Sequence, residues 1–136
     1  MTDLDAALAQ LPDPVMRRRV RHIVTENARV LDAAEVLRGG RVAELAPLLD
    51  ASHASMRDDF EITVPTVDLA VTTARGAGAI GARMTGGGFG GCIIALTEQG
   101  SADRVGAAVE RAFAAAGHAP PAFFVAHPAD GARRLR

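Results

Sequence analysis

Apolar side chains recur at steps of three and four along the first half of the chain, a spacing that predicts amphipathic helices. The first stripe consists of Met16, Val20, Ile23, Asn27, Val30, Ala34 and Leu37. We expect its helix to begin at Asp13 and Pro14, because Asp caps free amides and Pro suits the first helical position. The pair Gly39 and Gly40 ends the helix, since glycine readily takes the left-handed conformation.

Two further helices are expected before residue 76. The second apolar stripe consists of Val42, Leu45, Leu49, His53, Met56 and Phe60. Pro47 lacks a backbone donor and would clash with the preceding turn inside a helix, so the pattern predicts a kink there or a helix start near Glu44. Residues 63–65, Thr-Val-Pro, are typical of a cap and open a third helix that runs to about Arg75.

The second half of the chain changes to strand patterns. Residues 79–85 and the apolar run 92–96 flank a glycine-rich connection, which predicts an antiparallel hairpin. A fourth helix is expected over residues 101–116, and residues 122–126 are predicted to form a final strand. Helices followed by a β-hairpin–helix–strand unit define an α+β fold in one domain over residues 1–136.

Composition narrows the class of protein. The chain has 136 residues, 49% of them hydrophobic and 23% charged, which is typical of a soluble globular domain. The net charge of −1 argues against nucleic acid or an anionic membrane as a partner, and no run approaches the ~18 apolar residues of a membrane span. Cys92 is the one cysteine, so no intramolecular disulfide forms and a cytoplasmic location is expected. In its apolar strand, Cys92 is predicted to be a small core residue.

The candidate for chemistry is the segment Gly86, Gly87, Gly88, Phe89, Gly90, Gly91, with five glycines in six positions. Glycine lets a ligand approach the main chain, and successive amides in such a loop can form an anion-binding concavity. Phosphates are the usual occupants. The alternative is a hairpin turn whose glycines serve geometry alone, because the loop leads into a strand and lacks the helix of a Walker-type site.

Three segments resemble a known family. Residues 81–92, GARMTGGGFGGC, resemble the third signature motif of galactokinases, which belong to the GHMP small-molecule kinases. Residues 52–62, SHASMRDDFEI, are similar to the galactokinase pattern of Ser-His followed by Arg-Asp-Asp-aromatic, and residues 19–27 match a further block. The resemblance implies the ferredoxin-like carboxy-terminal domain of a GHMP kinase.

The same resemblance implies the activity. A galactokinase transfers the ATP γ-phosphate to the C1 hydroxyl of galactose with Mg²⁺, mainly by positioning and charge neutralisation. The family's galactose motif, nucleotide loop and catalytic Asp are missing from this sequence and belong to the amino-terminal half. We therefore expect no catalytic residue in this chain, no activity without the amino-terminal kinase domain, and self-association at high concentration. Two alternatives are a non-catalytic galactokinase-like ligand-binding or regulatory module, and a small interaction domain.

Several charged residues and two histidines are further candidates for a site. Arg83 either reaches a phosphate or pairs with Asp58 or Asp59. Arg57, Asp58 and Asp59 are interpreted as a structural ion-pair cluster. His22 and His53 have no second ligand at metal spacing, so a packing or surface role and no metal site are expected for each. The basic stretch of Arg17, Arg18, Arg19 and Arg21 lacks interleaved aromatics, which favours a solvated helix face over a nucleic-acid contact.

Overall fold

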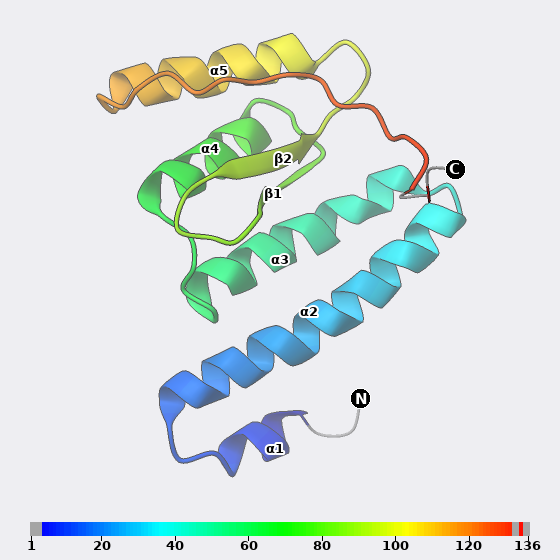
Figure 1. The fold of residues 1–136 in the computed structure, drawn as a ribbon, viewed down its shortest axis with the longest axis vertical. Helices are drawn as coiled ribbons and strands as arrows, with labels where there is room; N and C mark the ends of the chain where they lie inside the picture. The colour runs from blue at the N-terminus through cyan, green and yellow to red at the C-terminus, as the bar shows by residue number, and fades with distance from the viewer. Residues whose placement is uncertain (1–3, 132–133, 135–136) are drawn as a thin grey trace.

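The computed structural model describes residues 4–131 and 134 and confirms the α+β fold class. The elements in chain order are α1 (Leu4–Ala9), α2 (Pro14–Arg38), the 3₁₀ turn η1 (Val42–Glu44), α3 (Leu45–Asp58), α4 (Pro65–Gly76), β1 (Gly81–Thr85), β2 (Cys92–Leu96) and α5 (Ala102–Ala115). They are stacked in layers, with α5 at one end, then α4 and the hairpin, then α3, α2 and α1 (Figure 1). None of the described helices has the length and apolar character needed to cross a membrane.

Local chemistry sets the helix boundaries. The Asp13 side chain accepts a hydrogen bond from the Val15 amide at 2.8 Å, as the capping prediction required. The 3₁₀ turn η1 precedes α3, so the expected helix start near Glu44 is confirmed. Pro47 lies in the first turn of α3, where a missing N–H breaks no helical hydrogen bond. The short helix α1 was not predicted.

The two strands form the predicted antiparallel hairpin. Gly81 pairs with Leu96 and Thr85 with Cys92, and residues 86–91 connect the strands. A side chain at position 81 would come within 3.0 Å of the Ala46 backbone. Glycine therefore lets α3 pack directly against the start of β1, which fixes the hairpin relative to that helix.

The apolar core lies between α4, α5 and the hairpin. Its buried members are Ala70, Val71, Ala74, Ala79, Ala82, Val105, Val109 and Phe113. A smaller cluster of Met56, Val67 and Met84 joins α3 and α4 to the end of β1. Together these clusters hold the hairpin rigidly, so the glycine-rich connection projects from a fixed base.

Helix α2 packs on α3 with its more polar side. The side turned toward α3 carries His22, Glu26, Arg29, Ala33 and Val36, all buried or half-buried. The predicted apolar stripe takes only a small part in this contact, through Val30, which lines a small pocket with Leu45 and Leu49. Its larger members, Met16, Ile23, Val30 and Leu37, are exposed.

Two strand predictions fail. Residues 122–126 form no strand, and the described sheet has two strands. The segment instead runs along α5 (Figure 1), because the Phe123 ring packs where Gly106 has no side chain. Cys92 is exposed and not in the core, since β2 pairs with β1 alone and lies at an edge of the sheet.

Candidate functional site in the glycine-rich loop

The connection between β1 and β2 adopts a backbone that glycine favours. Positive φ angles occur at Gly86 (95°), Gly88 (87°), Phe89 (59°), Gly90 (126°) and Gly91 (90°). Side chains are strained in this region, so the glycine content follows from the conformation of the loop. Phe89 tolerates a positive φ at the tip and is 74% exposed.

One side of the loop rests on the segment between α3 and α4. The Phe89 amide donates a hydrogen bond to the Ile62 carbonyl at 2.6 Å. A side chain at Gly88 would come within 2.9 Å of that carbonyl and 2.8 Å of the Ile62 side chain. Ile62 therefore supports the loop from one side, which we call the Ile62 seat, and position 88 has room for glycine only.

The other side of the loop is open. A Cβ added at Gly86, Gly87, Gly90 or Gly91 would meet no atom within 4 Å. Apart from the Phe89 amide, the loop amides have no protein acceptor among the described residues. Successive unpaired amides can bind an anion, so the open side has the chemistry expected of a phosphate contact.

Arg83 lies at the centre of β1, and its guanidinium contacts residues of α2 and α3. Its Nη1 lies 3.6 Å from Glu26 Oε2, and its Nε donates to the Met84 carbonyl at 2.9 Å. The partner is a residue of α2 and not the expected Asp58 or Asp59. In this arrangement the guanidinium ties β1 to α2.

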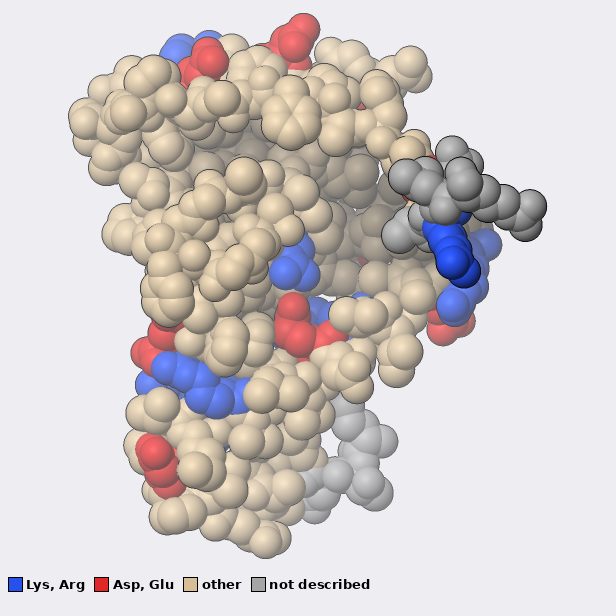
Figure 2. Space-filling view, viewed as in Figure 1, with Lys and Arg blue, Asp and Glu red and all other residues tan. Residues whose placement is uncertain are grey.

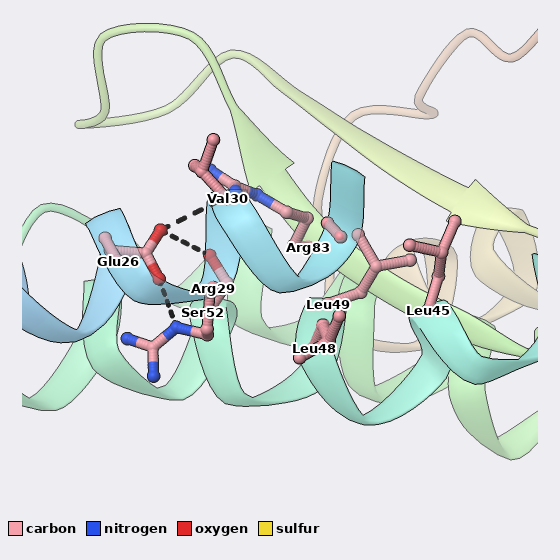
Figure 3. A pocket seen from close by; sticks show the side chains of 9 residues that line it. Glu26, Arg29, Val30, Leu45, Leu48, Leu49, Ser52 and Arg83 are labelled. Atoms are coloured by element: carbon pink, nitrogen blue, oxygen red, sulfur yellow. Dashed lines mark hydrogen bonds and ion pairs between the residues drawn. The ribbon is translucent and has the colours of Figure 1, made fainter. Parts of the chain in front are cut away.

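Glu26 is the hub of this contact (Figure 3). One carboxylate oxygen accepts from Arg29, and the other accepts from the Ser52 hydroxyl at 2.7 Å and faces Arg83. Burial acts to raise the pKa of Glu26, but the hydrogen bonds from Ser52 and Arg29 outweigh it, so the pKa lies below its usual value. The carboxylate is therefore charged and structural at neutral pH.

Two hollows in the surface differ in volume and in the residues that line them. A pocket of about 80 Å³ lies beside Glu26 and Arg83 (Figure 3), too small for a nucleotide or a sugar, since ligand sites have roughly 300–1,000 Å³. An open hollow of about 460 Å³ lies between α4 and α5 and is lined in part by Arg104 and Arg111. No loop residue lines either of these two hollows, so neither of them is a ligand pocket of the loop.

A buried His–Asp pair supports the base of the loop. The Met84 amide donates to His53 Nδ1 at 3.3 Å, so the neutral ring carries its proton on Nε2, which lies 3.1 Å from Asp68 Oδ1. Asp68 also accepts from Thr63, the residue after Ile62, at 3.2 Å. Burial lowers the pKa of His53, with Asp68 opposing the shift. His53 thus has the predicted packing role, linking α3, α4 and β1.

Arginines in the first half of α2 form ion pairs with acidic residues that follow α3. Arg18 and Arg19 pair with Glu61 at 3.2 and 2.6 Å, and Arg21 pairs with Asp59 at 3.2 Å. The basic stretch is therefore an ion-pair cluster and not merely a solvated face. Figure 2 shows charged side chains at the level of α2 and α3, and others at the top of the molecule, where α5 lies.

The predicted cluster of Arg57, Asp58 and Asp59 divides in two. Arg57 and Asp58 form an exposed pair with distances of 2.7 and 2.9 Å, whereas Asp59 belongs to the cluster with Arg21. His22 is buried, stacks on Phe60 and contacts the Ser55 hydroxyl at 3.0 Å. Within residues 4–131 and 134, no three His, Cys, Asp or Glu side chains gather closely enough to hold a metal ion.

Sequence reasoning did not identify three residues of this region. Ile62, Glu26 and Asp68 each act through a partner on another element, 15 to 57 positions away in the sequence. Asp68 had a local signal, because an acidic residue three positions after Pro65 is typical of a helix first turn. For Ile62 and Glu26 no local pattern exists.

The fold and the loop together define a kinase domain of known type. The family model for the C-terminal domain of GHMP kinases matches residues 33–115, and the chain belongs to this family. The predicted resemblance to the galactokinase branch is also confirmed.

Curated relatives and a solved structure carry this resemblance. The chain is 53% identical over 134 residues to the galactokinase of Streptomyces coelicolor, covering 98% of this chain and 35% of the relative. It is 48% identical over 131 residues to the galactokinase of Mycobacterium tuberculosis, covering 96% of this chain and 36% of the relative. Lactococcus lactis galactokinase in complex with galactose has a TM-score of 0.81 and 38% identity, covering 87% of this chain and 31% of that one. The chain thus spans about a third of the length of these relatives.

Proposed function

We propose that this chain works as the C-terminal domain of a galactokinase, which transfers the ATP γ-phosphate to the C1 hydroxyl of galactose. The observation that carries the proposal is the glycine-rich loop, whose one side is open, since a Cβ added at Gly86, Gly87, Gly90 or Gly91 would meet no atom within 4 Å. A half-built site of this kind suits a domain whose active site is completed by another part of the enzyme. Similarity to galactokinases over nearly the whole chain supports the same reading.

In this proposal residues 86–91 face the reacting phosphate and the sugar. The unpaired amides of the loop stabilise negative charge without a flexible side chain, and the Ile62 seat holds them in place. We assign Arg83 a structural role and not a phosphate contact, because it pairs with Glu26 of α2 at 3.6 Å. Among the described residues, no cluster of His, Cys, Asp or Glu side chains could hold Mg²⁺. We assign the binding of ATP and Mg²⁺ mainly to the amino-terminal domain of the complete enzyme. We place the complete enzyme in the cytoplasm.

The test uses a chimera in which this chain replaces the matched third of Streptomyces coelicolor galactokinase. Galactose-dependent ADP release should be absent for this chain alone and present for the chimera. A folded chimera without turnover would contradict the kinase proposal and favour the non-catalytic binding module. Turnover by the chain alone would contradict the requirement for the amino-terminal domain.

The contribution of the loop is tested at Gly87 and not at Gly88. A side chain at position 88 collides with Ile62 and has a strained φ, so Gly88→Val should lower both the melting temperature and turnover. Gly87 has open surroundings and no positive φ, so Gly87→Val should leave folding intact. By blocking approach to the amides it should lower turnover about 100-fold. Gly76→Val, equally open but outside the loop, is the matched control.

A further inference from the structure

We propose that His53 and Asp68 are positioning residues for the proposed phosphoryl transfer, because together they fix both attachment points of the glycine-rich loop. They act through the Met84 amide and through Thr63, and neither side chain is expected to touch a substrate. The inference rests on the proposed function, since it names the buried groups that hold the loop where the reacting phosphate would lie.

The first support is the contact of His53 at the entrance to the loop. The Met84 amide donates a hydrogen bond to His53 Nδ1 at 3.3 Å, and the loop begins two residues later at Gly86. Both residues are deep in the domain, since His53 is 5% exposed and Met84 is fully buried. The backbone direction at Met84 sets the direction in which the loop leaves β1, so His53 fixes the first attachment point.

The second support is the link between this entrance and the Ile62 seat. The Phe89 amide is bound to the Ile62 carbonyl, and the next residue, Thr63, donates its hydroxyl to Asp68 Oδ2 at 3.2 Å. The other carboxylate oxygen of Asp68 lies 3.1 Å from His53 Nε2. The two attachment points are therefore joined through one His–Asp pair, and the contacts close a ring with the backbone of the loop.

The third support is the chemistry of the imidazole. A neutral ring has one donor and one acceptor nitrogen, and only the tautomer with its proton on Nε2 can accept from the Met84 amide. The carboxylate of Asp68 faces Nε2 and therefore favours this tautomer. Burial lowers the pKa of His53, although Asp68 opposes the shift, so the ring is neutral at neutral pH. Asp68 thus keeps His53 in the one form that holds the entrance of the loop.

The position of the loop matters more for turnover than for folding. Backbone amides stabilise developing charge only when they are aimed at it, and a displacement of about 1 Å can lower a rate ~100-fold. A loss of the His53 contact should therefore lower kcat and leave the KM values nearly unchanged, because the amides act on the transition state.

The experiment compares two substitutions of His53 in the chimera with Streptomyces coelicolor galactokinase. An asparagine side chain can place its oxygen near the position of Nδ1, whereas a glutamine side chain can place its nitrogen near that of Nε2. His53→Asn therefore keeps the acceptor for the Met84 amide, and His53→Gln keeps only the donor to Asp68. His53→Gln should lower kcat about 10–100-fold with KM values within about twofold, and His53→Asn should recover most of that loss.

The matched control is His22→Gln. His22 is also buried, at 8% exposure, but it contacts the Ser55 hydroxyl and has no bond to the loop. His22→Gln should lower the melting temperature as much as His53→Gln does and leave kcat of the folded chimera unchanged. A His53→Gln chimera whose activity falls only with its folded fraction overturns the proposal. Equal losses for His53→Asn and His53→Gln also overturn it, because the acceptor for Met84 would then be irrelevant.

A second measurement needs neither turnover nor the chimera. Amide chemical shifts of residues 86–91 are recorded by NMR in this chain and in its Asp68→Asn variant, which should stay folded because the Asp68 side chain is 30% exposed. The loop amides should shift together with that of Met84. A shift confined to Met84, or no shift, overturns the proposal. Shifted loop amides beside a folded but inactive unsubstituted chimera would refute the proposed function and keep the positioning role.

Discussion

The two halves of the molecule are held together by different chemistry. Around α4, α5 and the hairpin the buried side chains are alanine, valine, methionine and phenylalanine, with no charged group among them. Between α2 and α3, hydrogen bonds such as Ser52 to Glu26 at 2.7 Å and His22 to Ser55 at 3.0 Å occur beside apolar side chains such as Val30 and Leu49. Apolar burial is the larger source of stability, since hydrogen bonds and exposed ion pairs have small net contributions.

The difference explains where the apolar residues of α2 go. A helix joined to its neighbour through polar groups keeps its apolar side free for another contact. The half around α4 and α5 has an apolar core of its own, whereas α2 meets α3 partly through polar side chains and leaves Ile23 and Leu31 exposed. The effects of mutations on the free energy of unfolding should therefore differ between the two halves, both in size and in their dependence on pH.

The largest effect is expected in the apolar half. Met84 is fully buried between α3 and α4, so Met84→Ala leaves a cavity and should lower the free energy of unfolding by about 2–5 kcal/mol. Urea unfolding measures the change. Leu31→Ala, on the exposed face of α2, should change the isolated chain by less than about 0.5 kcal/mol. Equal effects would show that α2 already buries its apolar face within this chain.

A smaller effect is expected at the hub of the polar half. Glu26→Ala removes the acceptor of Ser52 and Arg29 and should lower the free energy of unfolding by about 1–3 kcal/mol. A double-mutant cycle with Ser52→Ala isolates the hydrogen bond between them. Additive losses in this cycle would mean that the two side chains do not interact, and the polar half would need another explanation.

Acidification should weaken the polar half further. Burial lowers the pKa of His22 and of His53 below 6.5, so the unfolded chain takes up protons first as the pH falls. Stability is thus fully present above pH 6.5 and declines below it. Protonation of His53 also removes the acceptor for the Met84 amide. Ring-proton NMR titration measures both groups, and a ring that titrates above pH 6.5 would contradict this assignment.

The smallest effect is expected at the exposed pair of Arg57 and Asp58. The pair has good geometry, and the Arg57 hydrogen bonds lower the pKa of Asp58, yet both side chains are about half exposed. Asp58→Asn should change the free energy of unfolding by at most about 0.5 kcal/mol, and salt should reduce even that. A loss as large as that of Glu26→Ala would show that this pair organises the domain after all.

Much of the fold could be predicted from the chain itself, because the deciding interactions are local. Asp13 and Pro14 begin α2, η1 precedes α3 as Pro47 required, and the glycine-rich segment closes a hairpin. Each of these depends on residues only a few positions apart. The motif of residues 81–92 likewise carried the family resemblance without any structural information.

Tertiary structure decided what depends on distant neighbours. Periodicity shows that α2 has an apolar stripe, but only the tertiary structure shows that its larger members stay exposed. Residues 122–126 have strand-forming side chains, yet Phe123 packs against Gly106 of α5 and leaves β2 at the edge with Cys92 exposed. Arg83 pairs with Glu26, 57 positions away in the sequence. Position 88 accepts only glycine, because Ile62 lies directly beneath it. Periodicity and turn chemistry describe a segment, whereas side-chain partners are set by how the segments pack.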